Sequence, residues 1–184
     1  MSEIVVQKFG GTSVGTVDRI DSVAEIIKNA SKSNKIVVVV SAMGGETNRL
    51  VDLAKAFGDD PDKREFDALV STGETVSSAL LTMALHSKGV KAKSFSASQI
   101  SMRTTSSYSK AKILDVDAKK ILDVVENDTI PIITGFQGVT EGGDVTTLGR
   151  GGSDTTAVAI AAQISAIRCD IYTDVDGIFT TDPS

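Results

Sequence analysis

An arginine between glycines is the first feature of this sequence that can do chemistry. It stands in TLGRGGSDTT, residues 147–156, ahead of an alanine-rich run with the composition of a helix. Ser153 is a good helix N-cap and Asp154 a good first-turn residue, so both have an ordinary structural explanation. The glycines around Arg150 are not explained by a cap. They let the backbone approach a ligand, and the guanidinium can bind a carboxylate through two hydrogen bonds.

The stretch KFGGTSVG, residues 8–15, is a candidate for binding a phosphate. Gly10 and Gly11 allow backbone amides to approach phosphate oxygens, and the following helix adds the positive end of its dipole. Lys8 can bridge the same oxygens. The sequence is neither a P-loop, which requires lysine where Thr16 stands, nor a G-x-G-x-x-G fingerprint. The alternative is a tight strand-to-helix turn with a hydroxyl cap; the glycines favour neither, and the lysine favours phosphate.

Two further loops carry polar groups for which a structural explanation is strong. Ser41 and Thr47 supply hydroxyls in SAMGGET, which also fits a turn followed by a helix cap. Glu74 stands at a predicted helix start, where an acidic residue is stabilising in any case. Its functional interpretation is that the carboxylate neutralises an ammonium group on a substrate. His86 is the only histidine and lies late in a helical pattern, which argues against a catalytic triad or a histidine metal site.

Short apolar runs alternate with helical patterns along the chain, and this order predicts a mostly parallel sheet with helices on both faces. Such sheets bind ligands beyond the carboxyl ends of their strands. The serine-rich stretch 97–112 is ambiguous. We expect strands at 4–9, 35–40, 90–95, 130–135 and 168–174, a helix with the face Ile20, Val23, Ala24 and Ile27, and helices near 46–57, 63–71, 74–88, 117–126 and 153–165. The loops expected to meet are 8–13, 41–47, 134–138 and 173–177.

Composition limits the classes of partner. The 184 residues carry a formal charge of −5, which argues against a nucleic-acid partner. The single cysteine, Cys169, fits a reducing cytoplasm. The N-terminus lacks the features of a signal peptide, and no apolar run approaches the roughly 20 residues of a membrane helix. The chain ends where a parallel sheet would normally continue, so we expect residues 1–184 to form one incomplete domain.

Taken together, these segments resemble the aspartate kinases of the amino-acid kinase superfamily. The match runs from VVQKFGGTSVG to DIYTDVDGIFTTDP and covers nearly the whole chain. The motifs KFGGTS and GRGGSDTTA are specific to aspartate kinases, and VSAMGGETNRL and STGE agree with them. The last motif is shared with uridylate, carbamate and glutamate kinases. The resemblance implies a three-layer α/β/α sandwich, truncated at the C-terminus and without the regulatory ACT domains.

The resemblance also implies an activity: transfer of the γ-phosphoryl group of MgATP to the β-carboxylate of L-aspartate, the first step toward lysine, threonine and methionine. A carboxylate with a pKa of about 3.9 is already ionised at neutral pH, so no general base is needed. Catalysis then rests on alignment and charge neutralisation. ATP and Mg²⁺ are the implied cofactors, and the full-length form is expected to be a homo-oligomer. The alternatives are another amino-acid kinase, or a fragment that binds ligand without turnover.

The resemblance assigns roles residue by residue. Lys8 and Asp154 are the expected catalytic residues; the aspartate is expected to orient the lysine or to help organise the metal–phosphate assembly, and not to act as a base. Arg150 is expected to bind the α-carboxylate of the substrate and Glu74 its α-ammonium, while phosphate oxygens and water hold Mg²⁺ without a protein metal site. The expected ATP- and phosphate-binding residues are Lys8, Phe9, Gly10, Gly11, Ser41, Thr173, Asp174, Phe179, Asp182 and Pro183. The expected substrate-binding residues are Thr47, Glu74, Arg150, Gly151, Gly152 and Ser153.

One segment departs from the family pattern. Relatives commonly have glycine just before the A-x-I of the middle segment, whereas this chain reads Ser109-Lys110-Ala111-Lys112-Ile113. The sequence leaves open the conformation of residues 103–113 and any role of this segment in closing over aspartate.

Overall fold

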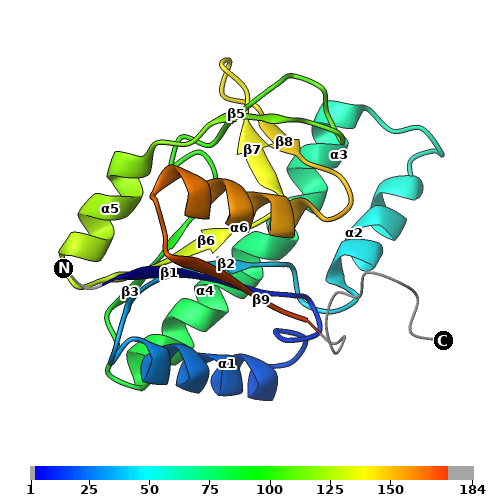
Figure 1. Ribbon diagram of the computed structural model, residues 1–184. Helices are drawn as coiled ribbons and strands as arrows, with labels where there is room; N and C mark the ends of the chain where they lie inside the picture. The colour runs from blue at the N-terminus through cyan, green and yellow to red at the C-terminus, as the bar shows by residue number, and fades with distance from the viewer. Residues whose placement is uncertain (1–2, 174–184) are drawn as a thin grey trace, which may run out of the picture.

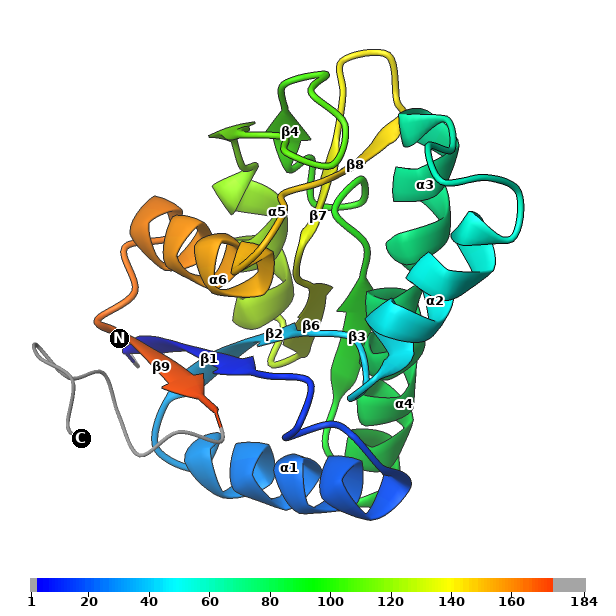
Figure 2. The same cartoon turned by 90° about the vertical axis from the view of Figure 1, so that its right-hand side faces the viewer.

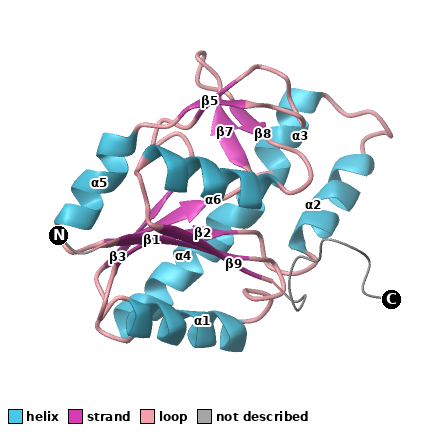
Figure 3. Cartoon of the chain, in the orientation of Figure 1, coloured by secondary structure: helices cyan, strands magenta, loops and turns pink. Residues whose placement is uncertain are grey.

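Five parallel strands form the centre of the molecule (Figure 1; Figure 3). The structure is a computed structural model that describes residues 3–173. The strand order is β3-β6-β2-β1-β9, and every neighbouring pair is parallel. The strands are β1 (Ile4–Phe9), β2 (Lys35–Val40), β3 (Ala92–Phe95), β6 (Ile130–Thr134) and β9 (Arg168–Tyr172). The predicted parallel sheet is therefore confirmed, with some strands shorter than expected.

Helices cover both faces of this sheet, as two views at right angles to each other show (Figure 1; Figure 2). Helices α1 (Val17–Ala30) and α4 (Thr72–Ser87) pack on one face, and α5 (Ala118–Glu126) and α6 (Gly152–Gln163) on the other. Side chains of a strand alternate between faces, so Phe9 enters the first core and Val6 the second. Lys8 has the same parity as Val6 and therefore points toward α6. The three-layer sandwich is confirmed.

A second, smaller sheet lies beside α3, away from the central sheet (Figure 2). Its order is β5-β4-β7-β8. Its strands are β4 (Arg103–Thr104), β5 (Ile113–Asp115), β7 (Gln137–Val139) and β8 (Val145–Thr147), and the adjoining helices are α2 (Glu46–Lys55) and α3 (Lys63–Val70). The sequence did not predict this sheet, because strands of two or three residues are too short to show an alternating pattern.

Helices α3 and α4 together form one helical segment, Lys63–Ser87, which is long and apolar enough to cross a membrane by length and composition alone. Half of its most apolar window is buried inside the protein. A core helix of a soluble protein passes the same test. The sequence shows no continuous apolar run here because serines and threonines interrupt the apolar residues.

Candidate active site

A pocket of about 430 Å³ lies at the carboxyl ends of β1 and β2. Loops that follow these strands line it, together with the first turn of α4 and the start of α6. This is the edge at which parallel sheets bind ligands. The pocket gathers most of the described residues that the sequence singled out. They are Lys8, Gly11, Ser41, Thr47, Glu74, Gly151, Gly152, Ser153 and Asp154.

Lys8 and Asp154 form an ion pair in this pocket. The Lys8 Nζ lies 2.7 Å from the Asp154 Oδ1. The lysine is 8% exposed, whereas the aspartate side chain is about half exposed. The same Oδ1 is buried and has no hydrogen bond of normal geometry among residues 3–173, so we regard the contact as electrostatic attraction without good hydrogen-bond direction. The Lys8 ammonium, paired with a single partly exposed carboxylate at the pocket wall, can still attract an anion.

Glu74 is a buried carboxylate with an unsatisfied oxygen. It lies in the first turn of α4 and is 3% exposed. Its Oε1 accepts a hydrogen bond of 3.1 Å from the Ala42 amide, and its Oε2 has no hydrogen-bond partner among the described residues. Burial raises the pKa of Glu74 to about 7, because removing water disfavours the charged form. Buried polar atoms are rarely left unpaired, so a cationic ligand would complete this site.

The start of α6 differs from the prediction. Ser153 is not the N-cap: the helix begins at Gly152, and Gly151 occupies the cap position with a φ of 70°. Gly149 also has a positive φ, of 81°. Two left-handed glycines turn the chain into the helix two residues earlier than a cap at Ser153 would. Gly151 offers no side chain as a cap, and the Gly152 amide donates to the Gly149 carbonyl at 3.1 Å. The next amides of the first turn, at Ser153 and Asp154, belong to residues that line the pocket.

Arg150 lies outside the pocket wall. Its side chain is exposed, and it makes no ion pair with any residue in the described range 3–173. The glycines on either side of it, Gly149 and Gly151, do line the pocket. The structure thus brings the glycines to the site and leaves Arg150 exposed outside the pocket wall, which the sequence pattern did not distinguish.

The predicted phosphate loop is only partly available. The Gly10 amide donates a hydrogen bond of 3.1 Å to the Tyr172 carbonyl and continues the sheet, so it cannot also bind a phosphate. Phe9 is 1% exposed, and its ring stacks on Tyr172 at 4.5 Å between centroids. Gly11 does line the pocket, where a Cβ would approach the Ala42 carbonyl to 3.0 Å. A side chain at this position would therefore require the Ala42 carbonyl to shift by a few tenths of an ångström.

The helix that follows this loop also lies elsewhere. Helix α1 begins at Val17, whose side chain is exposed and does not line the pocket. The predicted contribution of its dipole is therefore wrong. An irregular turn over residues 11–16 separates the loop from the helix. The helices whose starts reach the pocket are α2, α4 and α6, through Gly45, Glu74 and Gly152.

The remaining predicted residues follow β9. Thr173 is exposed directly after that strand. Asp174, Phe179, Asp182 and Pro183 lie outside the described residues. Within residues 3–173, no group of three His, Cys, Asp or Glu side chains is placed to hold a metal ion.

One functional candidate was missed by the sequence reasoning. Asp67 is fully buried in α3 and accepts hydrogen bonds from Ser109 and Thr147. It shares the buried face of the helix with Val70. A carboxylate on the apolar face of an amphipathic helix is the signal that could have identified it, because an unpaired buried charge is strongly unfavourable.

Comparison with known proteins agrees with this fold. The amino acid kinase family matches residues 3–184, so the chain belongs to that family. It is 56% identical over 181 residues to "Aspartate kinase Ask_LysC" of Stutzerimonas stutzeri, covering 98% of this chain but 44% of that protein. The chain thus spans less than half the length of this relative.

Two solved structures are also similar. Aspartate kinase from Synechocystis is 47% identical with a TM-score of 0.83; the match covers 97% of this chain and 30% of that one. Aspartokinase III from E. coli, in complex with aspartate and ADP, is 32% identical with a TM-score of 0.89 and coverages of 98% and 51%. These similarities are to the aspartate kinase members of the family.

Proposed function

We propose that this chain is the N-terminal catalytic portion of an aspartate kinase, which transfers the γ-phosphoryl group of ATP to the β-carboxylate of L-aspartate. The observation that carries the proposal is the pocket in which the unsatisfied Glu74 carboxylate and the Lys8–Asp154 pair occur together. An amino acid has an ammonium group that can pair with the Glu74 carboxylate. Its carboxylates can pair with cationic side chains or accept hydrogen bonds from backbone amides. The resemblance to aspartate kinases selects aspartate among the amino acids.

Substrate binding follows from the charges around the pocket. The α-ammonium of aspartate would pair with the free oxygen of Glu74. The α-carboxylate would be met by Arg150 turning inward from its exposed position, with the amide of Ser153 in the first turn of α6 beside it. The hydroxyl of Thr47 would contribute a further hydrogen bond. These contacts hold the β-carboxylate at a fixed distance from the phosphoryl donor.

The chemical step needs no protein base. One oxygen of the ionised β-carboxylate attacks the γ-phosphorus, the bond from that phosphorus to the β,γ-bridging oxygen breaks, and ADP leaves with the electron pair. The products are 4-phospho-L-aspartate and ADP. Lys8 would stabilise the negative charge on the transferring group, and Asp154 would hold the lysine in place.

ATP would enter beside β1 and β2. The Gly11 amide is the backbone donor at the pocket, since the Gly10 amide is used within the sheet. Ser41 lies on the same wall, and Thr173 marks the end of the neighbouring strand β9. Mg²⁺ would be held by phosphate oxygens and water and would neutralise charge on the phosphates. The buried Asp154 Oδ1, which pairs with Lys8 and has no hydrogen bond within the part of the chain that the structure describes, is compatible with an additional electrostatic contact of this kind.

We also propose a cytoplasmic location and a homo-oligomeric full-length protein. The free cysteine Cys169 agrees with a reducing compartment. The oligomeric state follows only from the resemblance to aspartate kinases.

The test is a coupled ADP-release assay on the full-length protein with aspartate, glutamate, acetylglutamate, carbamate and UMP as acceptors. We expect ADP release only with aspartate. Turnover confined to another acceptor would replace aspartate kinase by a different amino-acid kinase. Calorimetric binding of ATP and aspartate without any turnover would show a ligand-binding protein in place of an enzyme.

A further inference from the structure

The carboxylate of Asp67 joins three segments that are distant in the sequence. Its Oδ2 accepts the Ser109 and Thr147 amides, each at 2.8 Å. Its Oδ1 accepts the hydroxyls of the same two residues, at 3.0 Å from Ser109 and 2.9 Å from Thr147. Asp67 itself is 0% exposed and does not line the pocket. Its carboxylate is thus satisfied by four donors, and substrate cannot touch it.

These contacts define a clamp, which we name by its three residues Asp67, Ser109 and Thr147. Thr147 is doubly fixed, because its carbonyl also accepts the Ala111 amide at 2.9 Å. Ser109 adopts a φ of 63°, a left-handed conformation that is costly for a residue other than glycine. The clamp holds this segment in a single conformation despite that cost.

The clamp lies at the beginning of the loop that enters the pocket. Thr147 ends β8, and Gly149, Gly151 and Gly152 follow it into the pocket wall. A Cβ on Gly149 would meet the Ser109 carbonyl at 3.3 Å, so the clamped segment also packs on the loop directly. The position of the loop therefore depends on the position of Thr147.

The far end of the same loop is fixed independently. The Phe136 amide donates to the Thr156 hydroxyl at 3.1 Å, which ties α6 to the segment after β6. A Cβ on Gly135 would approach the Ser153 hydroxyl to 2.6 Å, so the helix packs closely there. The near end is held by the Leu148 amide, which donates to the Phe136 carbonyl at 3.0 Å, and by the clamp, which fixes Thr147 directly before it.

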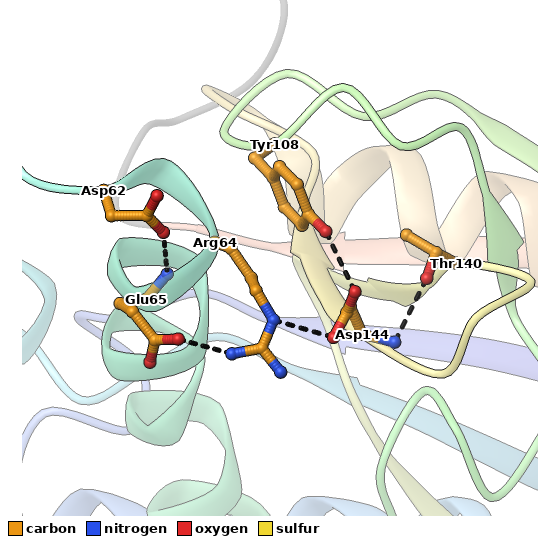
Figure 4. Close-up of polar contacts among 6 residues, drawn as sticks. All are labelled: Asp62, Arg64, Glu65, Tyr108, Thr140 and Asp144. Atoms are coloured by element: carbon orange, nitrogen blue, oxygen red, sulfur yellow. Dashed lines mark hydrogen bonds and ion pairs between the residues drawn. The ribbon is translucent and has the colours of Figure 1, made fainter.

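A second set of contacts joins α3 to the same region on the outside (Figure 4). Arg64, one turn before Asp67, donates to Asp144 at 2.8 Å, and the Tyr108 hydroxyl donates to the other oxygen of Asp144 at 3.0 Å. Arg64 also pairs with Glu65. This outer network is exposed, so it contributes less than the buried clamp.

We propose that Asp67 is a positioning residue for aspartate binding: by clamping Ser109 and Thr147 it sets the geometry of the loop that carries Arg150 and the start of α6. The inference rests on the proposed function, because it assumes that this loop binds the aspartate carboxylate. Asp67 acts through the loop and touches no substrate. A displacement of about 1 Å at such a site is enough to weaken binding severely.

The test compares Asp67→Ala with Asp67→Asn in the full-length protein. Alanine removes all four acceptors. Asparagine keeps the clamp, because its oxygen can accept both amides and its NH₂ can donate to both hydroxyls. We expect Asp67→Ala to raise the KM for aspartate about tenfold or more, with the KM for ATP within about twofold of wild type. Asp67→Asn should restore the aspartate KM to within about threefold. Calorimetry with aspartate alone should give the same order of affinities.

Each result supports or overturns the proposal. An unchanged aspartate KM in Asp67→Ala, an equal rise in both KM values, or equal defects in the alanine and asparagine variants would overturn it. If Asp67→Ala does not fold, Thr147→Val decides, because it removes one hydroxyl donor and keeps the side-chain shape. It should raise the aspartate KM about two- to fivefold, and an unchanged KM would again overturn the proposal.

Asp115→Ala is the matched control, since Asp115 makes an exposed ion pair with Arg103 in the same small sheet. It should leave both KM values unchanged. If the wild-type protein shows no aspartate-dependent ADP release, the proposed function fails. The positioning role fails separately, through the ratios between variants and an active wild type.

Discussion

The buried carboxylates of the pocket and of the clamp differ in how fully their oxygens are hydrogen-bonded. In the clamp, every hydrogen-bonding position of Asp67 that the structure describes has a donor of good geometry. In the pocket, Glu74 keeps one buried oxygen without a hydrogen-bond partner among residues 3–173, and Asp154 Oδ1 forms an ion pair with Lys8. Both carboxylates, Asp67 and Glu74, lie on the single helical segment formed by α3 and α4. A satisfied carboxylate fixes structure, whereas an unsatisfied one is available to a ligand.

The comparison makes a general prediction about substitutions. Changes in the pocket should alter catalysis and binding while leaving stability unchanged or improved. Changes in the clamp should lower stability and alter binding only through geometry.

The largest effect is expected for Lys8→Ala. Loss of the ammonium should lower kcat about 10²- to 10³-fold, as when one donor to the transferring group is removed, with a much smaller change in the aspartate KM. Steady-state kinetics with saturating ATP measure it. Lys119→Ala is the control, because Lys119 makes an exposed ion pair with Asp123. A Lys8→Ala enzyme with normal kcat but a raised aspartate KM would move Lys8 from the chemical step to substrate binding.

Arg150→Ala should mainly weaken aspartate binding, by about 2–4 kcal/mol, as for a lost charge-assisted pair. The free protein should keep its stability, since this arginine makes no ion pair within residues 3–173. Aspartate KM and thermal denaturation measure the two quantities. Arg103→Ala, which breaks the exposed pair with Asp115, is the control. If the KM does not change, the exposed position of Arg150 is its working position, and the glycine-rich start of α6 binds the carboxylate alone.

The sequence reveals features that depend on neighbouring residues, and it does not reveal those that depend on contacts between residues far apart along the chain. Runs such as KIVVVV predict the central strands, and the carboxyl-edge rule then brings Lys8 and Ser41 into one pocket. The use of the Gly10 amide by Tyr172 depends on the register between β1 and β9, which no local pattern encodes. The clamp contacts span 42 and 80 residues along the chain. Arg150 shows that a loop can be located from sequence without the direction of its side chain.

Glu74→Gln should raise the aspartate KM roughly 30-fold, which corresponds to a loss of about 2 kcal/mol in binding free energy, because the amide cannot neutralise the α-ammonium. In the wild type, the ionised form of Glu74 binds aspartate, and burial raises its pKa to about 7. The KM should therefore fall about tenfold from pH 6 to pH 8, and this dependence should disappear in Glu74→Gln. The KM for ATP serves as the internal control, since titration of ATP affects both proteins alike. A wild-type aspartate KM independent of pH would contradict the assignment.

The same substitution should stabilise the folded protein at alkaline pH. The pKa of Glu74 is raised from 4.5 to about 7 on folding, so the folded state holds its proton more tightly than the unfolded state. Its contribution to stability is complete below pH 4.5 and is lost as the pH rises to 7, a loss of up to about 3 kcal/mol. Glu74→Gln avoids that loss. Its unfolding free energy should exceed the wild-type value at pH 8 and converge with it near pH 4.5. Equal stability of both proteins at pH 8 would show that burial does not raise the pKa of Glu74 in the folded protein.

The smallest effect tests the clamp at Ser109, whose φ is 63° and whose hydroxyl binds Asp67. Ser109→Ala and Ser109→Gly both remove the hydroxyl, but only glycine adopts this backbone conformation without cost. Alanine should lower the unfolding free energy by about 1 kcal/mol, and glycine by less, because relief of strain offsets the lost hydrogen bond. Chemical denaturation measures both. If glycine were the more destabilising of the two, the left-handed backbone conformation at Ser109 would carry no measurable free-energy cost for a residue other than glycine.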